Sequence, residues 1–269
     1  MKKIAIITGA SSGIGKAFAR IIDRKEVFLD EIWLIGKTKS KLEKIAKELD
    51  HDTRIIDLDL TSSINLNTIR KLIARQKNFE ITVLVNSAGI GVDGCFEDAN
   101  YINIRSLLRL NIEAFTSIAY NCIPHMNAGA RIINMASAAS YLPQPYFSVY
   151  AASKSYVLSF TRALREELKK KDIIVSAVCP GPVNTNFFDN LKGAEKNLEF
   201  IGKANPMRVA YNAYQENLKG RGVITYGLQM KAFRVLSKVV PHSVLLPTYT
   251  GLINAINKCK KTGRESKVN

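Results

Sequence analysis

Seven short runs of β-branched and other apolar residues recur along this chain, separated by longer segments with apolar residues at three- and four-residue spacing. Continuous apolar runs are typical of strands buried on both faces, and the spacing between them is typical of amphipathic helices. Strands that alternate with helices form a parallel sheet covered on both sides. The pattern therefore predicts an α/β fold with a doubly wound parallel sheet. The strands are expected at Lys3–Thr8, Glu31–Ile35, Thr53–Asp57, Thr82–Asn86, Arg131–Ala136, Ile173–Cys179 and Gly222–Tyr226, and helices at Ser40–Leu49 and Ser62–Gln76 among others.

The alternation is regular up to about residue 185 and then breaks down. With 269 residues, of which 46% are hydrophobic and 23% charged, the chain can form one sizeable core. We expect a single domain over residues 1–269, in which about 1–185 carry the regular sheet and about 186–269 form a C-terminal extension. The extension contains a predicted helix at Met207–Leu218 and a basic amphipathic tail.

The composition excludes several classes of protein. The four cysteines and three histidines are widely spaced, so neither a metal site nor a disulfide framework is expected, and the thiols should be free. No uncharged run is long enough for a transmembrane helix. The apolar run after Lys3 has four residues, fewer than the roughly 7–15 of a signal peptide, so we expect a cytoplasmic protein. The residues concerned are Cys95, Cys122, Cys179, Cys259, His51, His125 and His242.

The formal net charge is +16, which in other proteins often reflects binding to an anionic partner. The lysines are spread along the whole chain, without an arginine- and aromatic-rich segment, so no nucleic-acid partner is expected. The simplest interpretation is a lysine-rich solvated surface. Attraction to an anionic cofactor, to lipid or to an acidic carrier protein stays open as an alternative.

A glycine-rich segment joins the first predicted strand to the first helical pattern. It reads Thr-Gly-Ala-Ser-Ser-Gly-Ile-Gly, with glycines at positions 9, 13 and 15. Glycines at such a turn let the backbone approach a pyrophosphate closely, and the following helix offers free amides and the positive end of its dipole. The segment predicts a dinucleotide site of the Rossmann type.

The residues after the second predicted strand bear on which dinucleotide binds. An acidic residue there would accept a hydrogen bond from a free ribose 2′-hydroxyl, whereas a basic residue suits a 2′-phosphate. This chain has Lys37 at that point, followed by the hydroxyls of Thr38 and Ser40, and no acid nearby. We therefore expect NADP(H) as the cofactor.

A phenol and an ammonium lie four residues apart at Tyr150 and Lys154, which on a helix puts them on one face. A free tyrosine ionises near pH 10, and a fixed cation nearby stabilises its phenolate. One such pair is expected by chance in a chain with ten tyrosines, so it is weak evidence alone. Ser137, just past a predicted strand, adds a hydroxyl where this fold carries reactive groups. Ser148 is expected to cap the helix.

Together these features resemble the classical short-chain dehydrogenase/reductase family, in order and over about residues 4–190. Two positions depart from the usual pattern, namely Ser87 and Ala136, and neither is expected to carry chemistry. The matching positions are Gly9, Gly13, Gly15, Asp59-Leu60, Asn86–Gly89, Asn111, Ser137, Tyr150, Lys154, Pro180-Gly181 and Thr185.

The resemblance implies a role for each matching residue. Tyr150 would exchange the proton, Lys154 would assist it and bind the ribose, and Ser137 would hold the substrate oxygen. Asn111 would anchor a water that links Lys154 to solvent. A homo-oligomer is expected. The implied cofactor-binding residues are Gly9, Ser11, Ser12, Gly13, Ile14, Gly15, Lys37, Asp59, Leu60, Asn86, Ala88, Gly89, Tyr150, Lys154, Pro180, Gly181, Val183 and Thr185.

Apolar and aromatic stretches should flank the substrate. They are Tyr141–Phe147 and the loop with Phe187, Phe188 and Leu191. Ser137, Tyr150, Phe187 and Phe188 are the candidate substrate-binding residues, and they favour a lipophilic carbonyl or alcohol such as a ketone, a steroid or an acyl chain. Core packing is an equal alternative for the aromatic residues.

The leading interpretation is an oxidoreductase that moves a hydride between NADP(H) and such a substrate. One alternative is a 3-oxoacyl thioester reductase acting on carrier-bound acyl chains, and another is a non-catalytic NADP(H)-sensing protein. From Met230 to Val240, Lys231, Arg234 and Lys238 are expected on one helical face, opposite Phe233, Leu236 and Val240. This segment could cover the pocket as a lid or contact a membrane peripherally.

Overall fold

Seven parallel strands form one sheet in the computed structural model, which describes residues 1–191, 202–251 and 254. The order of the strands is β3-β2-β1-β4-β5-β6-β7. All seven predicted strands are present within these residues, and the fold class is confirmed. Their bounds are β1 Lys2–Thr8, β2 Glu31–Gly36, β3 Thr53–Asp57, β4 Phe79–Asn86, β5 Arg131–Met135, β6 Ile174–Cys179 and β7 Val223–Thr225.

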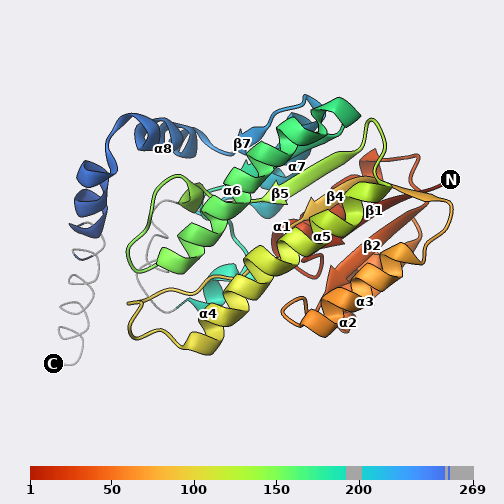
Figure 1. The fold of residues 1–269 in the computed structure, drawn as a ribbon, viewed down its shortest axis with the longest axis horizontal. Helices are drawn as coiled ribbons and strands as arrows, with labels where there is room; N and C mark the ends of the chain where they lie inside the picture. The colour runs from red at the N-terminus through yellow and green to blue at the C-terminus, as the bar shows by residue number, and fades with distance from the viewer. Residues whose placement is uncertain (192–201, 252–253, 255–269) are drawn as a thin grey trace.

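Helices cover both faces of the sheet (Figure 1). Alternate residues of β1 show how: Ile4 and Ile6 enter the core beneath α3, α5 and α6, whereas Ala5 and Ile7 enter the core beneath α1, α2 and α7. Because a strand points successive side chains to opposite faces, a continuously apolar strand supplies both cores at once. The helices are α1 Gly13–Lys25, α2 Lys39–Ala46, α3 Ser63–Ala74, α4 Tyr101–Leu108, α5 Phe115–Cys122, α6 Ser148–Leu168, α7 Pro206–Leu218 and α8 Leu228–Val239.

Short helical turns join several of these elements. The π-helix η1 spans Arg109–Ala114 and continues α4 into α5, and the 3-10 helix η3 spans Ala138–Ser140 after β5. The other 3-10 helices are η2 Ile123–His125, η4 Lys169–Lys171 and η5 Asn186–Asn190.

The direction of winding reverses between β1 and β4. The chain runs outward from β1 through β2 to β3, and then crosses back to continue from β4 to β7. A crevice forms at such a switch point, outside the carboxyl ends of the strands. Thr8 and Asn86 end the two strands there, and the Thr8 hydroxyl donates a hydrogen bond to Asn86 Oδ1 at 3.2 Å.

One local prediction is wrong, and a second feature differs in detail. Ser148 does not cap α6: it is the first helical residue, and Phe147 occupies the cap position without a side-chain hydrogen bond. In α8, Phe233 is partly buried, whereas Leu236, which was expected on the same helical face, is 47% exposed. α8 packs instead through Phe233, Arg234 and the buried Ser237, so its contact side combines apolar and polar residues.

Part of the C-terminal extension lies outside the described residues, including the basic end of the tail and Cys259. α8 and the helix that follows over residues 242–251 lie at one side of the molecule (Figure 1). Cys95, Cys122 and Cys179 are free thiols. In the part of the chain that is described, no helix is long and apolar enough to cross a membrane.

Candidate active site

Tyr150 and Lys154 lie one helical turn apart in α6, and both side chains are buried, with 7% and 5% exposed. The Lys154 Nζ lies 5.8 Å from the centre of the Tyr150 ring. It donates a hydrogen bond at 2.9 Å to the carbonyl oxygen of Met135, the last residue of β5. The predicted pair is therefore brought together, and β5 fixes the position of the ammonium.

Burial changes the acidity of Lys154. Loss of hydration lowers the pKa of its ammonium from 10.5 to about 8, because water stabilises the charged form most. At neutral pH the group is still mostly protonated. A buried cation beside a buried phenol can stabilise negative charge on the phenol oxygen and support proton transfer.

Ser137 lies two residues after the end of β5 and is the cap residue of the turn η3. Its Oγ accepts a hydrogen bond from the Ala139 amide at 3.2 Å, and the Ala138 amide donates to the carbonyl oxygen of Pro180 at 2.8 Å. The turn is also tied to α6, because the Ser155 hydroxyl donates to the carbonyl oxygen of Ser140 at 3.2 Å. The serine turn is thus held between α6 and the Pro180-Gly181 segment.

Asn111 is almost fully buried in the π-helix η1. Its Oδ1 accepts from the Ile90 amide at 3.0 Å, and its Nδ2 donates to the Ile90 carbonyl at 2.9 Å and to the Ser153 hydroxyl at 3.0 Å. A Cβ on Gly89 would lie 3.2 Å from Lys154 Nζ and 3.3 Å from Asn111 Oδ1. Asn111, Gly89 and Lys154 therefore meet, and a π-helix at this point is a common mark of a functional site.

The glycine-rich turn between β1 and α1 has the geometry of an anion cradle. Gly9 and Gly13 have φ angles of 67° and 55°, and a Cβ on Gly15 would lie 2.3 Å from the carbonyl oxygen of Gly9. The cap residue Ser12 makes no side-chain hydrogen bond to the first turn of α1, which contains no acidic residue. The first amides of α1 are therefore available to a phosphate group.

Ser11 of the glycine-rich turn lies against the end of β2, where Lys37 follows. A Cβ on Gly36 would lie 3.3 Å from Ser11 Oγ, so this hydroxyl lies against the end of β2. Lys37 is exposed and follows Gly36 directly, and α2 begins two residues later at Lys39. Of the residues that the sequence assigned to a 2′-phosphate, Lys37 thus follows a strand end that borders the glycine-rich turn.

Thr185 lies on the other side of the same turn. A Cβ on Gly13 would lie 3.0 Å from Thr185 Cγ2, although the two residues are far apart in the sequence. Val183 is buried and forms a bridge with Ala204, while Gly181 lies against Met230 of α8. The segment after β6 therefore closes over the crevice from the glycine-rich turn to α8.

Some predicted cofactor residues use their side chains inside the protein. Asn86 is buried and donates through Nδ2 to the Phe115 carbonyl at 2.8 Å, and Leu60 is buried in the core. Asp59 is exposed, and its Oδ1 accepts from the Thr61 amide at 2.9 Å. The Ala88 amide donates to the Thr8 hydroxyl at 3.0 Å, which fixes the Ala88-Gly89 segment beside the crevice.

Aromatic rings surround the phenol of Tyr150. The Phe147 ring stacks on it, with centroids 4.3 Å apart and planes at 27°, and the Phe187 ring lies at 5.3 Å. Phe188 packs edge-on against Phe187 at 5.4 Å and lies 5.0 Å from the Lys203 ammonium. Phe187 is therefore next to the predicted proton donor, whereas Phe188 is one ring further away.

The structure adds two residues that were not singled out from the sequence. Phe147 was recognised only as part of an apolar stretch, although its spacing three residues before Tyr150 was a usable signal. Gly91 was missed: a Cβ there would lie 2.7 Å from the Phe187 ring and 3.2 Å from Leu191 and Phe147. Gly91 therefore leaves the room that lets these side chains converge.

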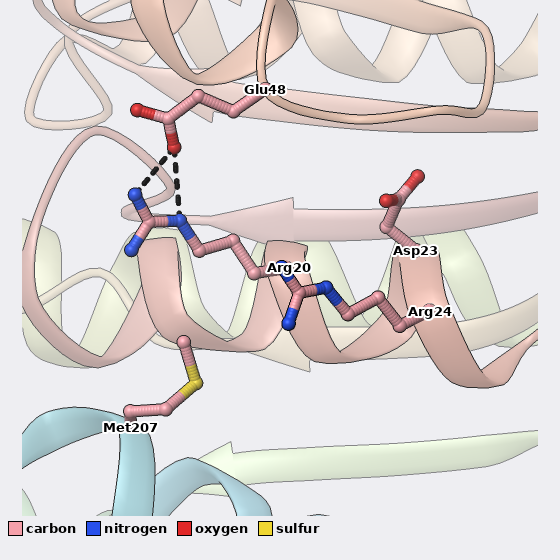
Figure 2. Close-up of a pocket in the computed structure, with 5 residues that line it drawn as sticks. All are labelled: Arg20, Asp23, Arg24, Glu48 and Met207. Atoms are coloured by element: carbon pink, nitrogen blue, oxygen red, sulfur yellow. Dashed lines mark hydrogen bonds and ion pairs between the residues drawn. The ribbon is translucent and has the colours of Figure 1, made fainter.

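A separate cavity of about 280 Å³ lies beside α1 and is lined by Arg20, Asp23, Arg24, Glu48 and Met207 (Figure 2). The Arg20 guanidinium donates to Glu48 Oε2 at 2.5 and 2.9 Å, and these hydrogen bonds lower the pKa of the Glu48 carboxyl. The lining is charged and contains none of the predicted catalytic residues. This cavity is distinct from the Tyr150 site, and its ion pair joins α1 to the segment after α2.

Comparisons with known proteins point to one family. A family model described as short chain dehydrogenase matches residues 3–196. An uncharacterized oxidoreductase of Staphylococcus epidermidis is 28% identical over 201 residues, which cover 74% of this chain and 86% of that protein. Human 17-beta-hydroxysteroid dehydrogenase type 3 is 32% identical over 195 residues, which cover 69% of this chain and 60% of that protein. A short-chain dehydrogenase from Sphingobium yanoikuyae, solved in complex with NADPH, has the same fold, with a TM-score of 0.74 and 22% identity over 90% of this chain and 97% of that one.

Proposed function

Because this chain belongs to the short-chain dehydrogenase family, we propose that it is an oxidoreductase that transfers a hydride between NADP(H) and a lipophilic carbonyl or alcohol. The observation that carries the proposal is the surroundings of Tyr150. Its phenol is buried among aromatic rings, one helical turn from the Lys154 ammonium. This combines a proton donor with an apolar wall, as the reduction of a lipophilic carbonyl requires.

The residues of the crevice fit a nicotinamide dinucleotide. The close contact between Gly15 and Gly9 leaves no room for a side chain at position 15. The first amides of α1 can donate hydrogen bonds to a pyrophosphate. When bound, the nicotinamide ring supplies or accepts the hydride. Pro180, Val183 and Thr185 would hold that end of the cofactor, and the Ala88-Gly89 segment would line the crevice between them.

We assign the preference for NADP(H) to Lys37 and Ser11. The exposed ammonium of Lys37 and the hydroxyl of Ser11 border the end of β2, where the adenosine ribose of such a cofactor would lie. Structures of the same fold hold NADPH or NAD, so the proposal depends on these residues and not on the fold. The proposed preference depends on charge, because the 2′-phosphate of NADP(H) is stabilised by a nearby cation, whereas the 2′-hydroxyl of NAD(H) carries no charge.

In the proposed mechanism of reduction, Ser137 donates a hydrogen bond to the substrate carbonyl oxygen and Tyr150 Oη transfers its proton to that oxygen. The charge left on the phenol oxygen is stabilised by the Lys154 ammonium, which the Met135 carbonyl holds in place. Asn111 lies beside Gly89 and Lys154 and would connect this ammonium to solvent through water. In the direction of alcohol oxidation the same groups act in reverse.

The substrate is proposed to lie along Phe187, whose ring lies beside that of Tyr150, and Phe188, whose ring packs on Phe187. Both side chains are only partly buried and can therefore contact a ligand. The human relative is a hydroxysteroid dehydrogenase, which is consistent with a bulky apolar substrate. Acyl chains are also apolar, so a 3-oxoacyl thioester is included among the substrates to be tested.

A homo-oligomer is also proposed. Figure 1 shows α4, α5 and α6 on one side of the sheet. Each of these helices carries exposed apolar side chains. Exposed apolar groups on neighbouring helices are typical of subunit interfaces. They are Tyr101, Ile102, Tyr120 and Tyr156. Sedimentation of the protein over a range of concentrations tests this, and a strictly monomeric protein would contradict it.

The central experiment is a panel of carbonyl compounds and alcohols, followed at the nicotinamide absorbance with NADPH and with NADH. The panel contains aliphatic and aromatic ketones, steroids and a 3-oxoacyl thioester. We expect turnover of bulky ketones or steroids with NADPH, and its loss in Tyr150→Phe. Turnover of the thioester alone would favour the acyl reductase. NADPH binding without turnover of any substrate would favour a cofactor-sensing protein.

A further inference from the structure

The outward side of α8 is apolar. Leu228, Val235 and Val239 are 82%, 60% and 75% exposed, and Leu236 is 47% exposed. Their spacing puts them on one face of the helix, with Ala232 between them. A surface helix normally turns such a face to the core. In α8 these apolar side chains face outward instead. The protein-facing side includes the buried Ser237 and the Arg234 guanidinium, which donates to the Val223 carbonyl at 3.4 Å.

Basic residues border this outer face. Residues 222–251 contain no aspartate or glutamate, whereas Lys231 and Lys238 are exposed on α8 beside the apolar side chains. The nearest preceding acidic residue, Glu216, forms ion pairs with Lys219 and Arg221, and the charge of Lys231 also lowers the pKa of its carboxyl. The lysines of α8 are thus the cations that the outer face offers to a partner. An apolar strip bordered by lysine is the pattern of helices that lie in the interface of an anionic membrane.

We propose that the outer face of α8 docks on the surface of a membrane that contains anionic lipid. Leu228, Val235 and Val239 would enter the boundary between headgroups and acyl chains, and Lys231 and Lys238 would bind the anionic headgroups. A helix of 12 residues is too short to span the bilayer, so it would lie in the plane of the surface. A second copy of the chain fits less well, since it would bring two sets of lysines against each other.

The contacts on the inner side of α8 show where the proposed membrane-binding face lies relative to the candidate active site. Met230 lies against Gly181, with 2.8 Å from its Sδ to a Cβ built on that glycine, and Phe233 lies 6.4 Å from the Tyr141 ring. α8 therefore rests on the segment that follows β6. Docking would bring this side of the crevice to the lipid surface. The proposal itself rests on the exposed face and its charges, and it holds whatever the substrate is.

Flotation of the full-length protein with vesicles tests the proposal. One set of vesicles contains equal parts of phosphatidylglycerol and phosphatidylcholine, and the other contains phosphatidylcholine alone. We expect binding to the anionic set and little binding to the neutral set. Val235→Gln/Val239→Gln and Lys231→Gln/Lys238→Gln should each weaken this binding by roughly tenfold or more. All four positions are partly or fully exposed, and an unchanged thermal midpoint will confirm that each variant is folded.

Matched controls separate this face from the general positive charge. Ile64→Gln removes an equally exposed apolar side chain from α3, and Lys170→Gln/Lys171→Gln removes two exposed lysines elsewhere. Both should bind like the wild type. Absence of binding to anionic vesicles, or equal loss in the controls and in the α8 variants, would overturn the proposal. So would a dimer in solution that Val235→Gln/Val239→Gln abolishes while vesicle binding is unaffected. None of these readouts depends on turnover.

Discussion

The ring of Phe147 is stacked on the ring of Tyr150, with their centroids 4.3 Å apart. Only two residues separate them in the chain, and the Ala151 amide donates to the Phe147 carbonyl at 2.9 Å, so the first turn of α6 fixes the pair. Phe187 restrains the same phenol from a distant part of the sequence. The direction of the phenol is therefore set before a substrate arrives, which is the condition for efficient proton transfer.

Replacement of Tyr150 by phenylalanine should abolish turnover and leave cofactor affinity nearly unchanged. The substitution removes only the proton donor and keeps the ring that packs on Phe147 and Phe187. General acid catalysis contributes about 10²–10⁴-fold, so kcat should fall by that order. Steady-state kinetics and cofactor titration measure both effects. Turnover within threefold of the wild type would exclude Tyr150 as the acid.

Lys37→Ala should reduce the preference for NADPH over NADH. A hydrogen bond to a charged group contributes about 1.5–3 kcal/mol, or roughly one to two decades in affinity, and the exposure of Lys37 favours the lower end. Titration of both cofactors by fluorescence measures this, and added salt should narrow the gap in the wild type. Lys41→Ala, an exposed lysine further along α2, is the control. Equal affinities of the wild type for both cofactors would show that the assignment is wrong.

Phe187→Ala should weaken the binding of lipophilic substrates more than Phe188→Ala does. The Phe187 ring lies beside the Tyr150 ring, whereas the Phe188 ring packs on Phe187 and lies near Lys203. Burial of a phenylalanine against a ligand contributes about 1.5–3 kcal/mol, so KM should rise by roughly one to two decades. Kinetic constants for a bulky and a short-chain ketone measure the effect. Equal losses for both ketones would indicate that these rings are core residues.

Lys154→Met should stabilise the protein while it removes activity, and the gain should depend on pH. Burial lowers the pKa of the wild-type ammonium from 10.5 to about 8, a shift worth roughly 3 kcal/mol. Between pH 8 and 10.5 the unfolded chain binds more protons than the folded chain at this residue, so wild-type stability rises relative to the variant across that window. The variant's advantage should therefore be largest at pH 7 and shrink towards pH 10.5.

Urea denaturation of the wild type and the Lys154→Met variant at several pH values measures this difference. Lys170→Met, at an exposed lysine, should show no such dependence. A difference between wild type and Lys154→Met that stays constant from pH 7 to pH 10.5 would contradict a lowered pKa for this residue.

The sequence alone determined the architecture. Continuous apolar runs and three- to four-residue spacing are local properties, and they located all seven strands and the fold class. The strand ends were less well defined. β4 begins at Phe79 rather than at Thr82, because pairing with β1 extends it through Glu80, which no apolar pattern would include. The cap of α6 was also misplaced, because a serine near the start of a helix is only a statistical signal for the cap position.

The juxtaposition of the candidate catalytic residues was also predicted from the sequence, because the spacing of Tyr150 and Lys154 on a helix brings them together whatever surrounds them. Their environment was decided by tertiary structure. The burial of Lys154, the approach of Phe187 to Tyr150 and the contact between Gly13 and Thr185 join segments that are distant in the chain. The exposed side of α8 belongs to the same class. A periodic pattern shows that a helix has two faces, but only packing against the rest of the molecule decides which face is covered.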